Sequence, residues 1–503
     1  MIKIEFFNGY IKNKEELCQQ LFINKNLSQR EKILKVLIEG YQRWGKDLPV
    51  HLRGYFSFAL YDTENNVIFG ARDRFGVVPF YYANNKFALH CDCYIKKIFS
   101  RLQIAKKINE KAVQLFMTFG FVPGTETFFQ NINQLRPGFR IIYNGTEICI
   151  EQYHTFCRKE FNWSFDEYKD KIDYILSENL KRMEVPKTGI LLSSGIDSNY
   201  LYAMSNIKKA FSIGFAENFF DESMIAYENA QLYYKNCERV ILKPEDFFES
   251  VEDATIYMEQ PIGNASSVAF MNGCKYASEK VDMCFTGEGA DELFAGYEIY
   301  KKSYLFSNGL TYLGKSHIFE ESEKKSLLKY YIDEIEDRKI VQELCPRKKM
   351  DSNLNYMMNV DIQMWLANDS FINTFKMSNP FKLKIRMPFI DEELFELAYS
   401  MPDDFKIQKG VNKYILRRSS EKVVPPKVSY YEKRGFVTPI RQWMKNEKHS
   451  IVIAEILNGE GIRKFYKEKE VNRIYNEFLN GNQKIWRKIW LLYSFAKWYE
   501  INF

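Results

Sequence analysis

The sequence lacks the segments that would direct a chain to export or into a membrane. Its first residues, MIKIEFFNGY, contain no basic stretch followed by an apolar one, which a secretory signal requires. No later stretch reaches the roughly 18 uninterrupted apolar residues that a membrane-spanning helix needs. We therefore expect a cytoplasmic protein with no membrane partner.

Paired cysteines are also lacking. The 9 cysteines show no repeated Cys-x-x-Cys spacing, so a reduced cytosolic chain is the simplest interpretation. His90, Cys91 and Cys93 lie close together in HCDC, but Cys-x-Cys places both thiols on one face of a strand beside a single histidine. We therefore interpret that stretch as part of a strand rather than as a metal site.

A strong excess of one charge is missing as well. The 71 basic and 65 acidic residues leave a net charge of +6, which by itself implies no nucleic-acid partner. No aromatic residues interleave with the basic run at residues 347–349, so a solvated loop is expected there. Internal repeats and low-complexity segments are absent too, which favours ordinary globular domains.

What the chain does contain is enough apolar residues for large cores. With 503 residues, of which 46% are hydrophobic, it is too long for one comfortable core and is expected to form two domains. Residues 1 to about 150 contain short alternating segments between turn residues, which predicts a mainly antiparallel sheet with one helix at about residues 29–44. These segments are YFSFALYD, NVIFGAR, KFALHCD, FRIIYNG and EICIEQY.

The pattern changes after the segment at residues 154–164. Helical stretches then alternate with the short apolar runs GILLS, KAFSIGF and VDMCFTG, which predicts a parallel sheet with crossover helices. The last third is mostly helical. There an apolar stripe at helical spacing, which we interpret as core packing, is formed by Trp486, Ile489, Trp490 and Tyr493.

The loop SSGIDS at residues 193–198 joins an apolar run to a helical pattern. Such a loop presents hydroxyls and backbone N–H groups at a helix N-terminus, where the macrodipole favours an anion such as phosphate. It is not a Walker A loop, because no Gly-Lys-Ser/Thr follows. Asp197 suits an anion site only if a cation such as Mg²⁺ lies between it and the phosphates. The alternative is an ordinary strand-to-helix turn with Ser and Asp as caps.

A second strand, at residues 281–285, is followed by a loop of similar build, FTGEGADELFAGY at residues 285–297. Ligands of open parallel sheets sit at the carboxyl ends of the strands, so both loops can face one crevice. Asp197 and Asp291 would then hold one Mg²⁺ between them. Gly287 and Gly289 would let the backbone approach closely.

At these two loops and elsewhere the sequence resembles the asparagine synthetase family. Its pyrophosphate loop, Ser-Gly-Gly-x-Asp-Ser, reads SSGIDS here, with serine for the first glycine, whereas its Gly-Glu-Gly-x-Asp-Glu-x-Phe-x-Gly-Tyr motif is intact at residues 287–297. The resemblance spans nearly the whole chain. It further includes FSIGF and FDES (211–223), EQPIGNASS (259–267), RMPFID (386–391), NKYILRR (412–418), KRGFVTP (433–439), FNGYIKNKEEL (7–17), GYFSFALYD (54–62), ARDRFGVVPFYY (71–82) and LRPG (135–138).

The resemblance implies an α/β protein with two domains. Residues 1–155 would form a degenerate N-terminal nucleophile hydrolase-like domain of αββα build, similar to class II glutamine amidotransferases. Residues 165–503 would form an ATP pyrophosphatase domain with a parallel sheet and flanking helices. With ATP and Mg²⁺, such an enzyme activates a carboxylate as its acyl-adenylate, releases pyrophosphate and lets ammonia or an amine attack. It would thus be an AMP-forming carbon–nitrogen ligase.

The resemblance also implies roles for particular residues. Lys433 matches the lysine of the family's mobile loop and would neutralise charge on the departing phosphate. Glu288 would position the incoming amine or take its proton, and Glu292 would brace the loop. ATP and pyrophosphate would be bound by Leu192, Ser193, Ser194, Gly195, Ile196, Asp197, Ser198, Ile213, Gly214 and Gly287.

The N-terminal part departs from the family pattern. Glutamine-using members need a cysteine after the initiator methionine, and here Ile2 stands there, while Tyr10 replaces the glutamate after Asn-Gly. Strands that precede FNGYIKN in the family are missing too, and Cys18 lies within a helical pattern. We therefore expect an inactive scaffold without glutaminase activity, so that nitrogen would come from ammonia, a separate amidotransferase or biosynthetic partner, or the substrate itself.

The C-terminal part departs at positions that could touch substrate. Phe375-Lys376 replaces the family's Asp-Arg pair, and Lys384 replaces an acid. Relatives with disabled glutaminase domains, such as β-lactam synthetases and lasso-peptide cyclases, use an amine of a small-molecule or peptide substrate. β-Lactam synthetases carry tyrosine at the position of Glu288, so the glutamate here favours intermolecular amide synthesis. A cyclase and a silent binding homologue remain as alternatives.

Overall fold

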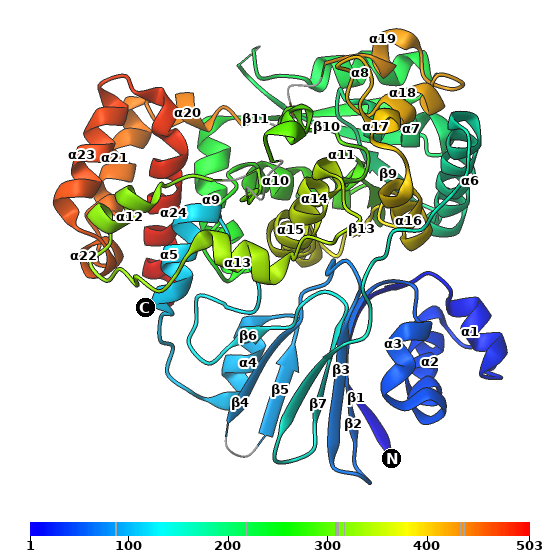
Figure 1. The fold of residues 1–503 in the computed structure, drawn as a ribbon. Coiled ribbons are helices and arrows are strands. Elements are labelled where there is room, and N and C mark those ends of the chain that lie inside the picture. The colour runs from blue at the N-terminus through cyan, green and yellow to red at the C-terminus, as the bar shows by residue number, and fades with distance from the viewer. Residues whose placement is uncertain (86–87, 218, 307–310, 316, 433–434, 436–437) are drawn as a thin grey trace. The chain divides into compact units, whose positions relative to one another are not determined.

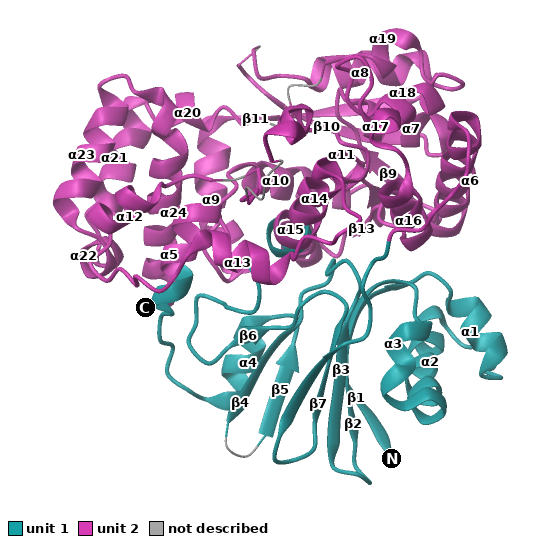
Figure 2. Cartoon of the chain, in the orientation of Figure 1, with its two compact units in different colours: residues 1–112, 122–157, 366–372 teal, residues 113–121, 158–365, 373–503 magenta. Residues whose placement is uncertain are grey.

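The computed structural model describes residues 1–503 except for residues 86–87, 218, 307–310, 316, 433–434 and 436–437. The chain divides into two units, which Figure 2 colours separately. Unit 1 comprises Met1–Ala112, Val122–Cys157 and Leu366–Ile372. Unit 2 comprises Val113–Phe121, Arg158–Trp365 and Asn373–Phe503.

Unit 1 is built around two antiparallel sheets. The larger has the strand order β1-β2-β3-β7-β8 and the smaller the order β5-β4-β6. Helices α1–α3 gather on one face of the larger sheet (Figure 1), where Val36 and Leu37 pack in one core with Phe56 and Phe58. The strands are β1 (Ile2–Ile11), β2 (Gly54–Asp62), β3 (Val67–Arg72), β4 (Tyr81–Asn85), β5 (Ala88–Asp92), β6 (Asn133–Gln134), β7 (Phe139–Tyr143) and β8 (Ile148–Gln152).

The helix expected at about residues 29–44 is α2, Gln29–Trp44. Ser28 accepts a hydrogen bond from the backbone N–H of Glu31, whose side chain accepts one from the N–H of Ser28. This capping box satisfies two of the free donors at the helix start. The expectation of one helix in this part of the chain is wrong, because four further helices lie here: α1 (Lys14–Gln20), α3 (Leu48–His51), α4 (Ile95–Leu102) and α5 (Glu110–Phe119).

Unit 2 contains a five-stranded parallel sheet in the order β11-β10-β9-β12-β13. The chain moves outward from β9 on one side through β10 and β11, and on the other side through β12 and β13. The order therefore reverses between β9 and β12, where the carboxyl ends of an open sheet form a crevice. The strands are β9 (Thr188–Leu191), β10 (Lys209–Phe215), β11 (Asn236–Leu242), β12 (Met283–Phe285) and β13 (Lys384–Arg386).

One set of helices surrounds this sheet, and a second set, mostly from the end of the chain, forms a separate group (Figure 1). Those near the sheet are α6 (Phe165–Met183), α7 (Ile196–Met204), α8 (Ser223–Leu232), α9 (Pro244–Met258), α10 (Ser266–Ser278), α11 (Ala290–Leu293), α14 (Asn353–Val360), α15 (Phe371–Ser378), α16 (Glu392–Ser400), α17 (Asp403–Lys406), α18 (Tyr414–Ser420) and α19 (Pro426–Ser429). The others are α12 (Glu321–Leu327), α13 (Asp337–Leu344), α20 (Ile440–Trp443), α21 (Glu447–Leu457), α22 (Glu460–Phe465), α23 (Glu468–Leu479) and α24 (Trp486–Asn502).

The predicted fold class is confirmed: the chain is α/β, with antiparallel sheets in its first part and a parallel sheet with flanking helices in its second. The tryptophan-containing stripe on α24 is core packing at Ile489, Trp490 and Tyr493, which are buried. Trp486 differs, because it is half-buried and lines a cavity. Three hydrophobic positions of four therefore behave as the pattern predicts.

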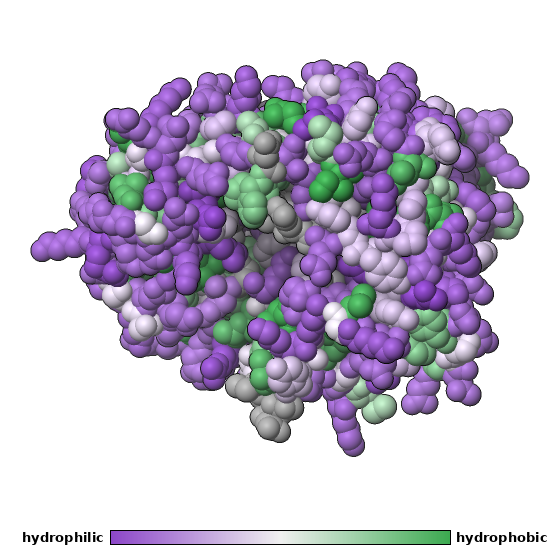
Figure 3. All heavy atoms as spheres, turned by 90° about the horizontal axis from the view of Figure 1, so that it is seen from above, coloured by the Kyte–Doolittle hydropathy of each residue, from purple (hydrophilic) through white to green (hydrophobic). Residues whose placement is uncertain are grey.

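Among the described residues, no helix combines the length and the apolar character needed to span a membrane. The face of the molecule drawn in Figure 3 is mostly hydrophilic, and the hydrophobic side chains on it lie in small groups.

Candidate functional site

The loop after β9 begins the site. The N-cap residue of α7 is Gly195, which has no side chain to cap the helix, and its own N–H donates to the Ser193 hydroxyl at 3.3 Å. The Ser198 hydroxyl accepts a 3.0 Å hydrogen bond from the N–H of Ser193, and the Asn199 amide donates to the carbonyls of Ser193 and Gly195. The loop is thus folded back on the helix start, where uncapped N–H groups favour an anion.

The loop after β12 lies directly against the first one. A Cβ on Gly287 would lie 2.7 Å from the Cβ of Asp197 and 2.9 Å from the N of Ser198, so only glycine allows this approach. Gly289 adopts a positive φ of 92° at the start of α11. The two strand-end loops predicted to face one crevice are therefore neighbours.

Asp197 and Asp291 meet at a lysine that sequence reasoning left without a role. The Nζ atom of Lys413 lies 2.6 and 2.7 Å from the two carboxylate oxygens of Asp197 and 2.6 Å from an oxygen of Asp291. The side chains of Lys413 and Asp197 are each only 5% exposed and that of Asp291 is 23% exposed. Burial alone lowers the pKa of Lys413, but the two carboxylates outweigh it and raise the pKa.

The backbone around Lys413 is fixed to the acidic motif. The side-chain amide of Asn412 donates to the carbonyls of Gly296 and Tyr297. A Cβ on Gly296 would lie 1.9 Å from an oxygen of Asp291 and 2.2 Å from the Cε of Lys413, so glycine is required at this position too. The signal in the sequence was a pair of acids expected in one crevice, since two buried carboxylates call for a buried cation.

The two aspartates fit Mg²⁺ only under a condition. Mg²⁺ takes oxygen ligands and is commonly bound through one or two carboxylates together with phosphate oxygens. Within the described part of the chain, no three His, Cys, Asp or Glu side chains are grouped to hold a metal. Asp197 and Asp291 could therefore bind the ion together with a nucleotide, provided that the ammonium of Lys413 leaves the space between them.

Glu288 lies on the same loop as Asp291 and accepts a 2.9 Å hydrogen bond from the Thr374 hydroxyl. Thr374 is on α15, and the same helix carries Lys376, whose buried ammonium pairs with the buried carboxylate of Glu259. Lys384, where the sequence replaces an acid by a base, is exposed on β13. One of the two departures is therefore buried on the helix that contacts Glu288, and the other faces solvent.

Glu292 is 2% exposed and accepts a hydrogen bond from the Tyr297 hydroxyl. Burial raises the pKa of Glu292 to about 7, although Lys315 opposes this change and Asp291 adds to it. The Nζ of Lys315 lies 3.8 Å from the ring centre of Tyr297 and 4.1 Å from that of Trp365. A cation between two aromatic faces thus connects the acidic motif to Trp365.

The remaining predicted residues are placed as follows. Leu192 and Ile196 are buried. The Ser194 hydroxyl donates to Glu222 at 2.6 Å. Gly214 packs closely on the FDES segment, since a Cβ there would lie 2.5 Å from an oxygen of Asp221. Lys433 lies outside the described residues. Ile213 packs against Gly273 of α10, where a Cβ would lie 2.4 Å from its Cδ1.

Comparison with known proteins gives matches to two family models. The asparagine synthase model matches residues 176–500, and the glutamine amidotransferase domain model matches residues 3–154. Asparagine synthetase [glutamine-hydrolyzing] 1 of Bacillus subtilis (strain 168) is 29% identical over 545 aligned positions, covering 99% of this chain and 85% of that protein. A putative asparagine synthetase [glutamine-hydrolyzing] of Mycobacterium tuberculosis (strain ATCC 25618 / H37Rv) is 25% identical, covering 98% and 84%.

Similarity to solved structures is weaker. Glutamine phosphoribosylpyrophosphate amidotransferase from B. subtilis, complexed with ADP and GMP, aligns with a TM-score of 0.21 and 15% identity over 47% of this chain and 45% of that one.

Proposed function

Because the chain belongs to the asparagine synthase family, and so to a family of ligases that form amide bonds with ATP, we propose that it is an AMP-forming carbon–nitrogen ligase. An oxygen of a carboxylic acid attacks the α-phosphorus of ATP, and the bond to the β-phosphate oxygen breaks, which yields the acyl-adenylate and pyrophosphate. An amine nitrogen then attacks the acyl carbon, AMP leaves, and the nitrogen loses a proton. The observation that carries the proposal is the Asp197–Lys413–Asp291 group between two strand-end loops.

In this proposal the chain's own residues hold the nucleotide. The uncapped start of α7 and the hydroxyls of residues 193–198 bind the phosphates. Lys413 exchanges its carboxylate partners for phosphate oxygens, because a triphosphate supplies more negative charge than two aspartates. Mg²⁺ bound by Asp197 and Asp291 with phosphate oxygens would neutralise charge on the departing pyrophosphate. Lys433 would serve the same end.

The second half-reaction is assigned to Glu288. Its carboxylate is oriented by the Thr374 hydroxyl, and from there it would position the amine or accept its proton. Glu292 is held by Tyr297 and braces the loop. Gly214 packs closely on the FDES segment, so the nucleotide would contact its backbone.

We propose further that unit 1 does not hydrolyse glutamine. The amide of Asn8, which the family keeps before glycine, donates to the sulfur of Cys93 at 2.7 Å. Cys18 is buried within α1, and its burial raises the pKa of the thiol, so it is a poor nucleophile. The nitrogen would come from ammonia, a separate amidotransferase or the substrate.

A cyclase that uses a substrate amine is the second candidate. The observation in its favour is the buried Lys376–Glu259 pair, since Lys376 departs from the family pattern and lies on the helix whose Thr374 contacts Glu288. Retention of Glu288 supports the intermolecular reaction.

The test is exchange of labelled pyrophosphate into ATP, screened over small carboxylic acids and short peptides. We expect exchange with one class of acid and dependence on Mg²⁺. If the protein binds ATP but none of these acids supports exchange, the adenylation proposal is contradicted. Product analysis with the active acid then separates an intermolecular amide from a ring.

A further inference from the structure

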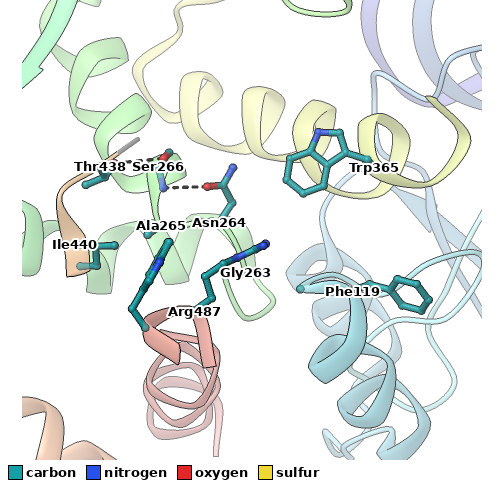
Figure 4. A pocket seen from close by; sticks show the side chains of 11 residues that line it. Phe119, Gly263, Asn264, Ala265, Ser266, Trp365, Thr438, Ile440 and Arg487 are labelled. Atoms are coloured by element: carbon teal, nitrogen blue, oxygen red, sulfur yellow. Dashed lines mark hydrogen bonds between the residues drawn. The ribbon is translucent and has the colours of Figure 1, made fainter. Parts of the chain in front are cut away.

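Unit 2 contains a cavity of about 240 Å³ to which no role has yet been given (Figure 4). Its lining includes polar side chains from the start of α10, a guanidinium from the start of α24, and aromatic rings from several segments. Among the lining residues are Asn264, Ser266, Trp365, Thr438, Trp486 and Arg487.

The floor of the cavity is a loop that α24 holds in place. The Ser494 hydroxyl accepts a 2.6 Å hydrogen bond from the N–H of Ile262, and the Trp490 indole donates to the carbonyl of Ile262 at 2.8 Å. The Trp498 indole donates to the carbonyl of Glu259 at 3.0 Å. These bonds fix the backbone just ahead of Asn264, so the cavity is formed before any ligand arrives.

Contacts connect the cavity to the residues proposed for the reaction. α15 carries both Thr374, which contacts Glu288, and Lys376, which contacts Glu259 at the start of the cavity loop. On the other side, the Thr438 hydroxyl lies 3.3 Å from that of Ser266, and Thr438 belongs to the motif that contains Lys433. The cavity lining therefore contacts Thr438 of the motif that contains Lys433, and α15 links the cavity loop to Glu288.

The lining has a one-sided charge. Arg487 is its charged member, and none of the described residues that line the cavity is an acid. Figure 4 shows the Arg487 side chain rising from the start of α24 toward Asn264, with Trp365 and Phe119 across the open space. A guanidinium has five N–H donors in a planar fork and can bind a carboxylate while keeping another partner. A substrate ammonium, by contrast, would meet no carboxylate among the described residues of this lining.

The size and the walls limit the ligand further. A volume of 240 Å³ corresponds to about eight water molecules at ~30 Å³ each, which suits a single ring with its substituents. Trp365 and Trp486 provide flat apolar surfaces for such a ring, and Asn264, Ser266 and Thr438 provide hydrogen bonds at its edge.

We propose that this cavity binds the non-reacting end of the acid substrate, and that this end is a carboxylate on a planar apolar body without a free ammonium group. Calling this ligand the acid substrate rests on the proposed function. The binding of such a ligand to the cavity does not depend on that function. The proposal predicts selection for aromatic dicarboxylates and against α-amino acids.

Isothermal titration calorimetry without ATP tests the binding, with isophthalate, benzoate, L-phenylalanine and L-aspartate as probes. We expect isophthalate to bind most tightly and both amino acids at least about tenfold more weakly, since each would bury an unpaired ammonium. Tighter binding of L-aspartate than of isophthalate, or no binding of isophthalate, would overturn the inference.

Variants show whether the cavity is the place of binding. Arg487→Met should weaken isophthalate about tenfold or more, since a hydrogen bond to a charged group is lost, whereas Arg473→Met, on the exposed face of α23, should leave it unchanged. Asn264→Leu is the second variant if Arg487→Met does not fold, and the same loss is expected. Unchanged binding in folded variants would place the ligand elsewhere.

The two proposals fail in distinguishable ways. If isophthalate binds in a way that depends on Arg487 but no acid supports pyrophosphate exchange, the ligase proposal is wrong and the cavity proposal stands. If pyrophosphate exchange proceeds with L-aspartate and is unchanged in Arg487→Met, the cavity proposal is wrong and the ligase proposal stands.

Discussion

The ammonium of Lys413 lies 2.6 Å from a carboxylate oxygen of Asp197, and both side chains are almost fully buried. The same nitrogen reaches Asp291 at the same distance. A buried cation between two acids keeps them from repelling each other, and it stands where the proposed function requires a divalent ion.

Asp197→Asn and Asp291→Asn should each lower pyrophosphate exchange by at least ~10²-fold while the chain remains folded. Each substitution removes one charge from the proposed metal site but keeps the size of the side chain. The measurement is exchange with the acid found by screening, alongside circular dichroism. Normal exchange in either variant would show that the metal is held elsewhere.

Lys413→Met should lower the free energy of unfolding by ~3–5 kcal/mol, because it leaves two neighbouring carboxylates without their buried counter-charge. Mg²⁺ should then stabilise the variant more than the wild type, since the ion can replace the ammonium. Thermal unfolding with and without Mg²⁺ measures both effects. Lys422→Met, which removes an exposed cation that follows α18 and pairs with the exposed Asp170 of α6, is the control, and an equal Mg²⁺ effect in all three proteins would contradict the shared site.

Glu288→Gln should retain pyrophosphate exchange and lose amide product, because only interactions of the later transition state are removed. Thr374→Val, which removes the hydroxyl that donates to Glu288, should slow amide formation about tenfold, the cost of one lost hydrogen bond. Both half-reactions are measured on the same preparations. Equal loss of exchange and product in Glu288→Gln would instead assign Glu288 to the nucleotide site.

A pH effect on stability is expected from Lys406, which lies outside the Asp197–Lys413–Asp291 group. Its fully buried Nζ donates to Asn355 at 2.6 Å, and burial lowers the pKa of Lys406 from 10.5 to about 8, with Asp403 opposing the change. Between these values the unfolded chain binds more protons than the folded one, so stability rises with pH. The gain is at most ~3 kcal/mol. Denaturant unfolding from pH 8 to 10 should show a smaller rise in Lys406→Met than in the wild type, and equal slopes would be the contrary result.

The nitrogen source can be followed with isotopes. With ATP, Mg²⁺ and the active acid, ¹⁵N-amide glutamine should give unlabelled product or none, because glutamine hydrolysis needs a cysteine with a base beside it and Cys18 is buried in a helix. ¹⁵N-Ammonium should label an intermolecular amide. Label arriving from glutamine with this chain alone would refute the scaffold proposal, and a product that is unlabelled in every case would favour the cyclase.

The elements with local signals were predictable from the sequence. The strand YFSFALYD was predictable from its high content of aromatic residues and its bounding turns, although β2 is buried on both faces over residues 55–60, and α2 carries its own capping box at Ser28. The loop at residues 193–198 was found because strand, glycine and helix follow one another directly. Gly287 could be assigned to close backbone approach because its motif is contiguous.

The long-range contacts were not predictable in this way. Lys413 lies 216 positions from Asp197, and a lysine that follows a turn looks the same whether it is solvated or buried between acids. The helical stripe predicts that Trp490 is a core residue. Its indole hydrogen bond to the carbonyl of Ile262 depends on a loop that is distant in the sequence, so it could not be predicted. Patterns of single segments report burial but not the partner.

The hydrogen bonds that α24 makes to the cavity loop also bear on the order in which the protein can mature on the ribosome. Ile262 precedes Ser494 by 232 positions, so at ordinary synthesis rates of ~5–20 residues per second the loop waits on the order of ten seconds or more for its partner. Its peptide groups and the apolar wall behind it stay unpaired during that interval. A nascent chain stopped short of α24 would therefore expose this region to chaperones and proteases, although every residue of the nucleotide loops had already been made.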